Sequence, residues 1–284
     1  MTFPRVLSLW HTLKDTMSSL TGSQTCSAAN KRGFDSWTIT QLQSALANEK
    51  TPDPCFLNVM AGARIPPQTA LAEAKEMLSP GTDSTSVTLA HTLYAISSNQ
   101  AFQDELASDI AASEWPTDMS SLEAIPSLVA CVKEGIRWTG AATAMLPRVV
   151  PKGGALVEGA EPPGGTKVSS SPAWYLHHET AFPDPERYRP SRWLEQRNER
   201  NPLDEYYIPF SKGPSTCIGV HFVYLELYLS VSQILRKYRI RPRSGNNLLA
   251  DHEAVLPSRG EWATAAPLQR LEVTLEERWS SDVN

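Results

Sequence analysis

The sequence has few cysteines and no closely spaced pair of them. The four are scattered along the chain, at Cys26, Cys55, Cys131 and Cys217. Structural zinc sites and disulfide frameworks both require clustered or regularly spaced cysteines. The spacing therefore argues against both kinds of site. We expect free thiols in a reducing compartment, with a separate role only for Cys217.

Basic charge is also scarce. The 284 residues contain 26 Lys and Arg against 31 Asp and Glu, which gives a formal net charge of −5, and no run of Lys and Arg occurs. Proteins that bind nucleic acid normally carry a basic patch that neutralises phosphates. The composition therefore argues against a nucleic-acid partner.

Long apolar runs are absent as well. A membrane-spanning helix needs about 20 mostly apolar residues. Residues 1–20 have apolar side chains at helical spacing, but Arg5, His11, Lys14 and Asp15 interrupt them. We predict a surface helix there and no secretory signal. The chain also contains no Gly-x-Ser-x-Gly, no phosphate-binding glycine loop and no His-Glu-x-x-His, so the enzyme classes built on these motifs find no support.

The residues that are present suit a globular fold, because 41% are hydrophobic and can build a sizeable core. Apolar spacing and capping signals predict helices, one of them interrupted at Pro80-Gly81 and the next capped by Asn99. Short β-type pieces lie between Gly and Pro turns. The expected fold class is mainly α with a minor β part. The predicted helices are 35–46, 68–98, 100–112, 127–138 and 217–238, and the predicted strands are 146–150, 155–157, 167–170 and 271–275.

The stretch from Phe210 to Gly219 surrounds the most informative cysteine. Gly213 and Gly219 permit tight backbone turns, and a helix is predicted to start at Cys217. The free N–H groups and positive dipole end of a helix favour a thiolate over a thiol. Phe210 can cover the ligand face and exclude water. The pattern indicates a thiolate cradle, although for an isolated cysteine a small buried apolar residue would be the better interpretation.

Three charged residues are spaced so that they could meet. Glu134 and Arg137 stand at i and i+3 of a predicted helix and share one face. Arg192 follows in a proline-rich loop, within Pro190-Ser191-Arg192-Trp193. Taken alone, the first two could form an ordinary solvated ion pair of little energetic value, and Arg192 could be a loop arginine.

A polar segment, Gly81-Thr82-Asp83-Ser84-Thr85, lies within the long predicted helix. An acid beside an alcohol can relay protons to a reacting group, which gives Asp83 and Ser84 a candidate catalytic role. Without other motifs, a polar, kinked turn on a surface helix would be the simpler interpretation.

Together these motifs resemble the cytochrome P450 family. The cysteine loop is similar to the family's haem-ligand loop, Glu134 to Arg137 to its Glu-x-x-Arg helix, Pro190 to Trp193 to its meander, and Gly81 to Thr85 to its oxygen-activation site. They occur in the family's order. The resemblance implies a cytochrome P450-like fold and haem b, with Cys217 as the axial thiolate ligand of the iron. It also implies that Asp83 and Ser84 deliver protons and that Glu134, Arg137 and Arg192 form a buried structural network.

The resemblance extends to other cofactor contacts, with Phe210, Gly213 and Gly219 shaping the loop. Arg148 stands where the family often has an arginine that reaches a haem propionate, although an exposed strand arginine is an equal alternative. There are three departures from the family pattern. Ser215 replaces a usual Arg or His, Pro80 replaces Ala or Gly, and Ser84 replaces Thr.

The resemblance implies that residues 1–284 form a single partial cytochrome P450 domain, truncated at the N-terminus. We expect upstream helices in residues 1–66, the oxygen-activation and Glu-x-x-Arg helices in 67–140, and the β segments, meander, cysteine loop, final long helix and tail in 141–284.

The function expected from the resemblance is that of a haem-thiolate monooxygenase. It would insert one oxygen atom from O2 into an apolar small molecule, in fungal secondary metabolite biosynthesis. Electrons would come from NADPH through a partner cytochrome P450 reductase, and a full-length form would reside at the endoplasmic reticulum membrane. Two alternatives stay open: a haem-thiolate isomerase or dehydratase, and a truncated or degenerate cytochrome P450 without catalytic activity.

Overall fold

The computed structural model divides into two compact units, Met1–Ser79 and Pro80–Asn284. The predicted helix at residues 1–20 and most of the one at 35–46 lie outside the described residues. The single-domain organisation expected above stays a prediction. The residues that the structure describes are 62–194, 202–243, 254–261 and 264–278, together with Ser36, Thr40, Val59 and Met60.

Helix α4 (Pro67–Ser98) is the longest element, and it crosses the boundary between the units. It runs without a break through Pro80 and Gly81, so the predicted interruption is wrong. A proline inside a helix removes one backbone hydrogen bond, and here the helical bonds on either side of it are enough to keep the helix continuous.

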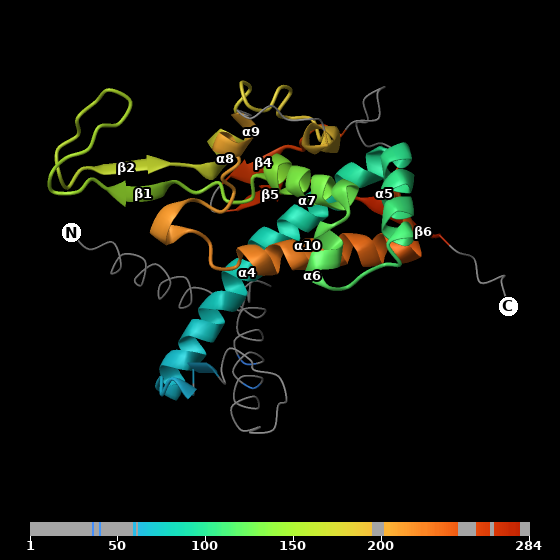
Figure 1. Cartoon of the computed structure of the whole chain (residues 1–284), viewed down its shortest axis with the longest axis horizontal. Helices are drawn as coiled ribbons and strands as arrows, with labels where there is room; N and C mark the ends of the chain where they lie inside the picture. Colours follow the sequence, from blue (N-terminus) through green and yellow to red (C-terminus); the bar gives the residue numbers. More distant parts are fainter. Residues whose placement is uncertain are drawn as a thin grey trace, which may run out of the picture. The chain divides into compact units, whose positions relative to one another are not determined.

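Helices α5 (Gln100–Ala112), α7 (Pro126–Thr139) and α10 (Val220–Lys237) pack on one another in the second unit (Figure 1). The predicted cap of α5 is confirmed, because the Asn99 side chain accepts a hydrogen bond from the Phe102 N–H at 3.0 Å. The short α6 (Met119–Glu123) also packs against α7 and α10. The prediction of a helix at 127–138 is likewise confirmed.

The core of this unit lies between α5, α7, α10 and the end of α4, where apolar side chains interlock. Helix α7 approaches α4 closely at Gly135: a Cβ added there would lie 2.1 Å from Thr92 Oγ1. Such a distance is a clash, so only glycine fits at this position. Fully buried members of the core are Ile96, Leu106, Ile110, Leu128, Cys131, Leu227, Val231 and Leu235.

The described strands form three antiparallel pairs: β1 (Leu146–Val149) with β2 (Lys167–Ser170), β3 (Tyr238–Pro242) with β6 (Val273–Glu277), and β4 (Arg259–Glu261) with β5 (Ala265–Pro267). The prediction of a strand at 155–157 is wrong, since only an isolated bridge joins Val157 to Ala160. The Gly and Pro residues on both sides of residues 155–157 favour turns over an extended strand. The mainly α class with a minor β part is confirmed.

A buried glutamine joins α5 to β3. Gln103 is fully buried, and its side chain accepts from the Ile240 N–H at 2.8 Å and donates to the Ile240 carbonyl at 2.9 Å. The amide thereby supplies the two bonds that a neighbouring strand would make.

Four short helices punctuate the loops that carry the site: α8 (Pro172–Leu176), η1 (Pro190–Trp193), α9 (Pro202–Tyr206) and η2 (Gly213–Ser215). Within the described part of the chain, no helix combines the length and apolarity that crossing a bilayer requires.

Candidate functional site

The cysteine loop folds back on itself ahead of α10. The Cys217 N–H donates to the Phe210 carbonyl at 2.9 Å, and the Thr216 N–H donates to the Gly213 carbonyl at 3.0 Å. The Thr216 hydroxyl donates to the same carbonyl at 2.8 Å. These bonds fix the loop while the Cys217 thiol stays exposed, so the sulfur is available to a ligand.

Two details of this loop differ from expectation. Gly213 has φ +77° and so needs the freedom of glycine, but Gly219 has φ −85° and makes no left-handed turn. The predicted start of the helix at Cys217 is also wrong, because α10 begins at Val220 with Gly219 as its N-cap. The reason is that Ile218 and Gly219 form a turn before the first helical residue. The thiol therefore lies ahead of the helix start.

A cavity of about 220 Å³ brings Cys217 together with residues far away in the sequence. Ser84 and Thr88 come from α4, and Ile136 comes from α7. Most of the lining is apolar, which suits an apolar guest. The remaining lining residues are Gly140, Ala141, Ala142, Leu146, Pro172, Leu176, Pro209, Phe210, Ser211, Ser215 and Val223.

The two predicted proton-delivering residues occupy different surroundings. Ser84 lines the cavity and is half-buried, whereas Asp83 is exposed and does not line it. Two further hydroxyls lie on the same helix: Thr85 ends the polar segment noted in the sequence, whereas no motif indicated Thr88. Thr88 lines the cavity and donates to the Ser84 carbonyl at 2.8 Å, and the buried Thr85 hydroxyl has no hydrogen-bond partner in the structure.

Arg148 lies on strand β1 and reaches across to the cysteine loop. Its Nη2 donates to Ser211 Oγ at 3.1 Å, and its Nη1 donates to the Pro147 carbonyl at 3.0 Å. Ser211 itself lines the cavity. Arg148 is thus an exposed strand arginine that does not line the cavity, and its guanidinium is linked to the cavity through Ser211, where it could meet an acidic group of a bound molecule.

Phe210 lines the cavity at the start of the cysteine loop. Its ring packs on Tyr224 of α10 with centroids 5.6 Å apart, and Tyr224 shares a hydrogen bond of 3.0 Å with the Tyr207 hydroxyl. The aromatic contacts hold the loop against the helix that follows it.

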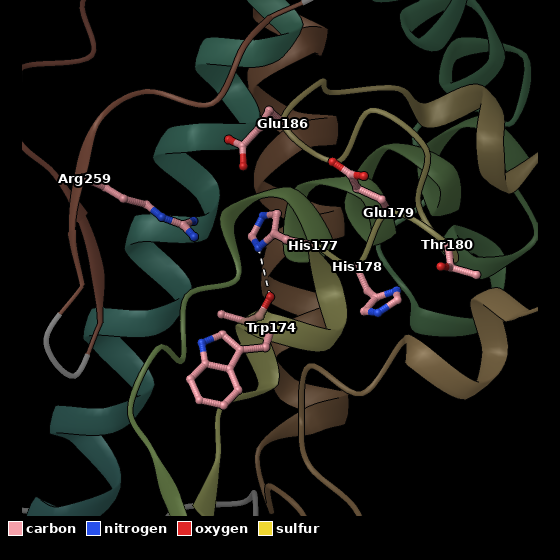
Figure 2. A pocket seen from close by; sticks show the side chains of 8 residues that line it. Trp174, His177, His178, Glu179, Thr180, Glu186 and Arg259 are labelled. Atoms are coloured by element: carbon pink, nitrogen blue, oxygen red, sulfur yellow. Dashed lines mark hydrogen bonds between the residues drawn. The ribbon is translucent and has the colours of Figure 1, made fainter.

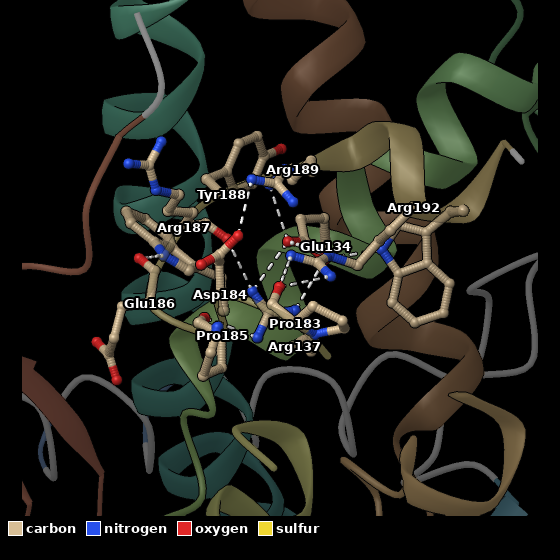
Figure 3. A network of polar contacts seen from close by, with 12 residues as sticks. Glu134, Arg137, Pro183, Asp184, Pro185, Glu186, Arg187, Tyr188, Arg189 and Arg192 are labelled. Carbon is tan, nitrogen blue, oxygen red and sulfur yellow. Dashed lines mark hydrogen bonds and ion pairs between the residues drawn. The ribbon is translucent and has the colours of Figure 1, made fainter. Parts of the chain in front are cut away.

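Glu134 of α7 is the centre of a buried polar network (Figure 3). Its Oε2 accepts from Arg137 Nε at 2.9 Å, and its Oε1 accepts from Arg137 Nη2 at 2.9 Å and from Arg192 Nε at 3.0 Å. All three side chains are buried. The structure thus brings together the three residues that the sequence grouped.

Two donors to Glu134 were not anticipated. The Trp193 indole donates to Oε2 at 2.8 Å, and the Arg189 backbone N–H donates to Oε1 at 2.9 Å. Trp193 directly follows Arg192, so their adjacency was the available signal. Arg137 in turn donates to the carbonyls of Leu176, Pro185 and Arg187. These bonds hold the segment 176–187 against α7.

The charges in this network determine the ionisation of its carboxylate. Burial by itself raises the pKa of Glu134, but the attraction and hydrogen bonds of Arg137, and then of Arg192, outweigh it and lower that pKa overall. Glu134 therefore stays ionised in the folded chain. Its contribution to stability is present above the carboxyl's unfolded pKa and is lost as the pH falls through the lowered, folded value.

A second, larger hollow of about 600 Å³ lies away from the cysteine (Figure 2). Its lining mixes charges of both signs, and His177 at its floor has its two ring nitrogens 3.0 Å from the carbonyls of Ala173 and Trp138. Among the described residues, no cluster of His, Cys, Asp or Glu suits a metal ion. The other lining residues are Trp174, His178, Glu179, Thr180, Glu186 and Arg259.

The cysteine cavity fits haem better than it fits a bare metal ion. A protein-bound zinc ion usually needs three or four side-chain ligands, and the lining of this cavity contains Cys217 but no His, Asp or Glu. Haem carries its own ring of ligands, so a single thiolate is enough to hold its iron. At about 220 Å³ the cavity is smaller than a whole haem, so its apolar walls and the neighbouring Arg148 suit one part of the ring and one acidic arm.

Comparison with known proteins shows to which family the chain is similar. The cytochrome P450 family model matches residues 39–261. Cytochrome P450 monooxygenase macH of Penicillium terrestre is 31% identical over 215 residues, which cover 70% of this chain and 42% of the relative. For sdnE of Sordaria araneosa the identity is 30%, with 65% and 38% covered. For claJ of Penicillium crustosum it is 30%, with 68% and 47% covered.

The chain spans about two fifths of the length of the curated relatives it matches. The family match extends over well more than half of the chain and includes every motif discussed above, from the polar segment of α4 to the cysteine loop. The chain therefore belongs to the cytochrome P450 family.

Proposed function

We propose that this chain forms the haem-thiolate part of a monooxygenase that inserts one oxygen atom from O2 into an apolar small molecule. The observation that carries the proposal is the shared cavity: the Cys217 thiol and the Ser84 side chain line the same apolar space. The relatives named as monooxygenases come from fungi. The proposal places the reaction in fungal secondary metabolism, because the sequence from Leu146 to Trp193, which includes the β segments and the meander, also resembles fungal family members of that kind.

The roles of the residues follow from where they lie. Cys217 would ligate the iron, and Phe210 would shield the thiolate from water. Bound haem supplies the activation of dioxygen by electrons. Arg148 would hold an acidic arm of the cofactor at the cavity rim. The apolar walls would bind the substrate and keep water away from it.

Proton supply is the second task of the chain. The Ser84 hydroxyl can hold a proton at the cavity, and the exposed Asp83 beside it can take one up from solvent. The two residues are consecutive in α4, with Asp83 exposed to solvent and Ser84 at the cavity. Retention of this acid and alcohol supports a monooxygenase over an isomerase or dehydratase, which has no such need.

The proposal includes partners. Electrons would come from NADPH through a cytochrome P450 reductase, and a full-length form would lie at the endoplasmic reticulum membrane. The substrate class is an apolar small molecule, and no nucleic acid takes part.

The ligand assignment is tested by the spectrum of the reduced carbon monoxide complex. With Cys217 as ligand, the chain loaded with haem should show the red-shifted absorption band of thiolate-ligated haem. Cys217→Ala should abolish the band, while replacing the buried Cys131 with Ala should leave it in place. A Cys217→Ala variant with an unchanged band would refute the assignment.

Proton delivery is tested by the coupling of NADPH use to product. Ser84→Ala should consume NADPH but release hydrogen peroxide in place of product. Ser86→Ala is the matched control, because Ser86 is exposed and its hydroxyl donates only along the helix, to the Asp83 carbonyl. Equal coupling in the two variants would remove Ser84 from the mechanism.

A specific observation favours a second candidate, a degenerate cytochrome P450 without activity. Cys217 is exposed, Ser215 provides no charge for a haem propionate, and the apolar Ile218 and Phe222 are 85% and 62% exposed. An open site of this kind should hold haem weakly. The two candidates separate on haem content: stoichiometric, slowly exchanging haem in the purified 284-residue chain supports the enzyme, and its absence supports the second candidate.

A further inference from the structure

Ser211 is the residue of the cysteine loop whose backbone is most unusual for its type. It has φ +65°, a left-handed conformation that glycine adopts easily and that other residues enter only at a cost. Strained residues of this kind persist where the surrounding structure uses their geometry, and they are common at ligand sites. Because glycine would adopt this backbone at lower cost, the presence of a serine side chain at position 211 requires an explanation.

The side chain supplies that explanation. Ser211 Oγ accepts a hydrogen bond of 3.1 Å from Arg148 Nη2, which joins the loop to strand β1 across 63 positions of sequence. Its backbone N–H donates to the Ile208 carbonyl at 3.1 Å, and the residue lines the cavity of Cys217. The left-handed backbone thus goes together with a hydroxyl that lies between the cavity and the guanidinium.

The guanidinium held in this way can still bind an anion. Arginine has five N–H donors, and the structure uses two groups of them, Nη2 on Ser211 and Nη1 on the Pro147 carbonyl. A planar fork whose orientation is fixed loses less conformational freedom when it binds a carboxylate. The lining of the cavity itself includes no cationic side chain, and its Ser215 is neutral, so the nearby cation is Arg148, which is bonded to the lining residue Ser211.

We propose that Ser211 is a positioning residue that orients Arg148 toward a carboxylate arm of the cofactor, and that the chain retains serine in a strained backbone for this purpose. The inference rests on the proposed function. According to this inference, Ser211 strengthens the binding of haem, whereas its strained backbone lowers the stability of the folded chain.

Ser211→Gly is the decisive variant. It relieves the left-handed backbone, so the melting temperature of the haem-free chain should stay equal or rise. It also removes the hydroxyl, so the affinity for iron protoporphyrin IX should fall by about threefold to tenfold, as for the loss of one hydrogen bond. Ser211→Ala keeps the strain and should show the same loss of affinity. Ser113→Ala is the matched control, since it deletes an exposed hydroxyl bond outside the site, to the Asp109 carbonyl, and should bind haem as the unaltered chain does.

Two further measurements separate positioning from general damage to the loop. With iron protoporphyrin IX dimethyl ester, whose arms are uncharged, the unaltered chain and Ser211→Gly should bind equally. In an Arg148→Gln background, Ser211→Gly should produce no further loss, because the two residues act as one unit.

The outcomes distinguish this inference from the proposed function. An unaltered chain that binds no haem through Cys217 would overturn both. Normal binding by the unaltered chain, together with an unchanged affinity in Ser211→Gly, or with an equal loss for the ester, would overturn the role of Ser211 alone.

Discussion

The Glu134 network and the Cys217 loop belong to the same unit but differ in enclosure. Glu134 and Arg137 are 0% exposed, and Glu134 accepts two hydrogen bonds at Oε2 and three at Oε1. Cys217 is exposed, and the hydrogen bonds described for its loop lie within the loop or reach the nearby Ile208 and, through Ser211, Arg148. Buried hydrogen bonds are therefore concentrated in the network, whereas the cavity of Cys217, where we propose that the chemistry takes place, is open.

The largest effect on stability is expected from removing the centre of the network. Glu134→Ala leaves two buried arginines without their carboxylate, and breaking a buried pair in this way costs about 3–5 kcal/mol. Chemical denaturation should show this loss or the protein should be insoluble. Glu105→Ala, at an exposed position of α5, should stay close to the unaltered chain. A soluble Glu134→Ala protein of normal stability would contradict the structural role.

The next effect comes from the contact of α7 with α4. In an exposed helix, Gly→Ala would stabilise by about 1 kcal/mol, but a Cβ at Gly135 would lie 2.1 Å from Thr92 Oγ1. Gly135→Ala should therefore destabilise the chain by about 1–3 kcal/mol. Adding Thr92→Ala should recover part of the loss, because it clears the clash. Independent, additive effects of the two changes would show that the helices are not in contact there.

A smaller effect should appear in the dependence of stability on pH. His91 is fully buried, its Nδ1 lies 2.8 Å from the Val87 carbonyl and its Nε2 has no hydrogen-bond partner. Burial chiefly lowers the pKa of His91, so the unfolded chain binds the proton more tightly. Stability should be complete above the ordinary histidine pKa of about 6.5 and should fall as the pH drops below it.

The variant His91→Leu should flatten this acid-side slope. Some slope should persist, because burial also lowers the pKa of His177. Urea unfolding of both proteins at a series of pH values gives the slopes. An identical slope in the variant would show that His91 does not titrate with folding.

The smallest effects on stability are expected from replacing either of the two cysteines that the structure describes, Cys131 and Cys217. Cys131 is buried, 3.2 Å from the Tyr188 hydroxyl, and burial raises the pKa of its thiol to about 12. Cys131→Ala should cost on the order of 1 kcal/mol, and Cys217→Ala should stay within about 0.5 kcal/mol. A thiol reagent should modify Cys217 in the native chain and Cys131 only after unfolding. Equal costs would remove the distinction between a structural and a ligand cysteine.

Much of the helical structure could be predicted from local signals. The Asn99 cap and the apolar spacing after it placed α5 with its observed bounds, and the 127–138 pattern found α7 within one residue at each end. Local signals gave wrong predictions for one helix break and one helix start. Pro80-Gly81 indicated a break that the long helix does not make, and Cys217 was placed in a helix that begins three residues later.

The sequence by itself determined the family and the fold class and indicated the candidate site residues, because motif spacing and apolar periodicity are local properties of the chain. Only the tertiary structure decided which of these residues meet. It placed Ser84 on the cavity of Cys217 and left Asp83 outside the lining. It also joined Trp193 to Glu134 and Ser211 to Arg148. Contacts between segments so far apart depend on how the helices and loops pack, and no spacing along the chain records that.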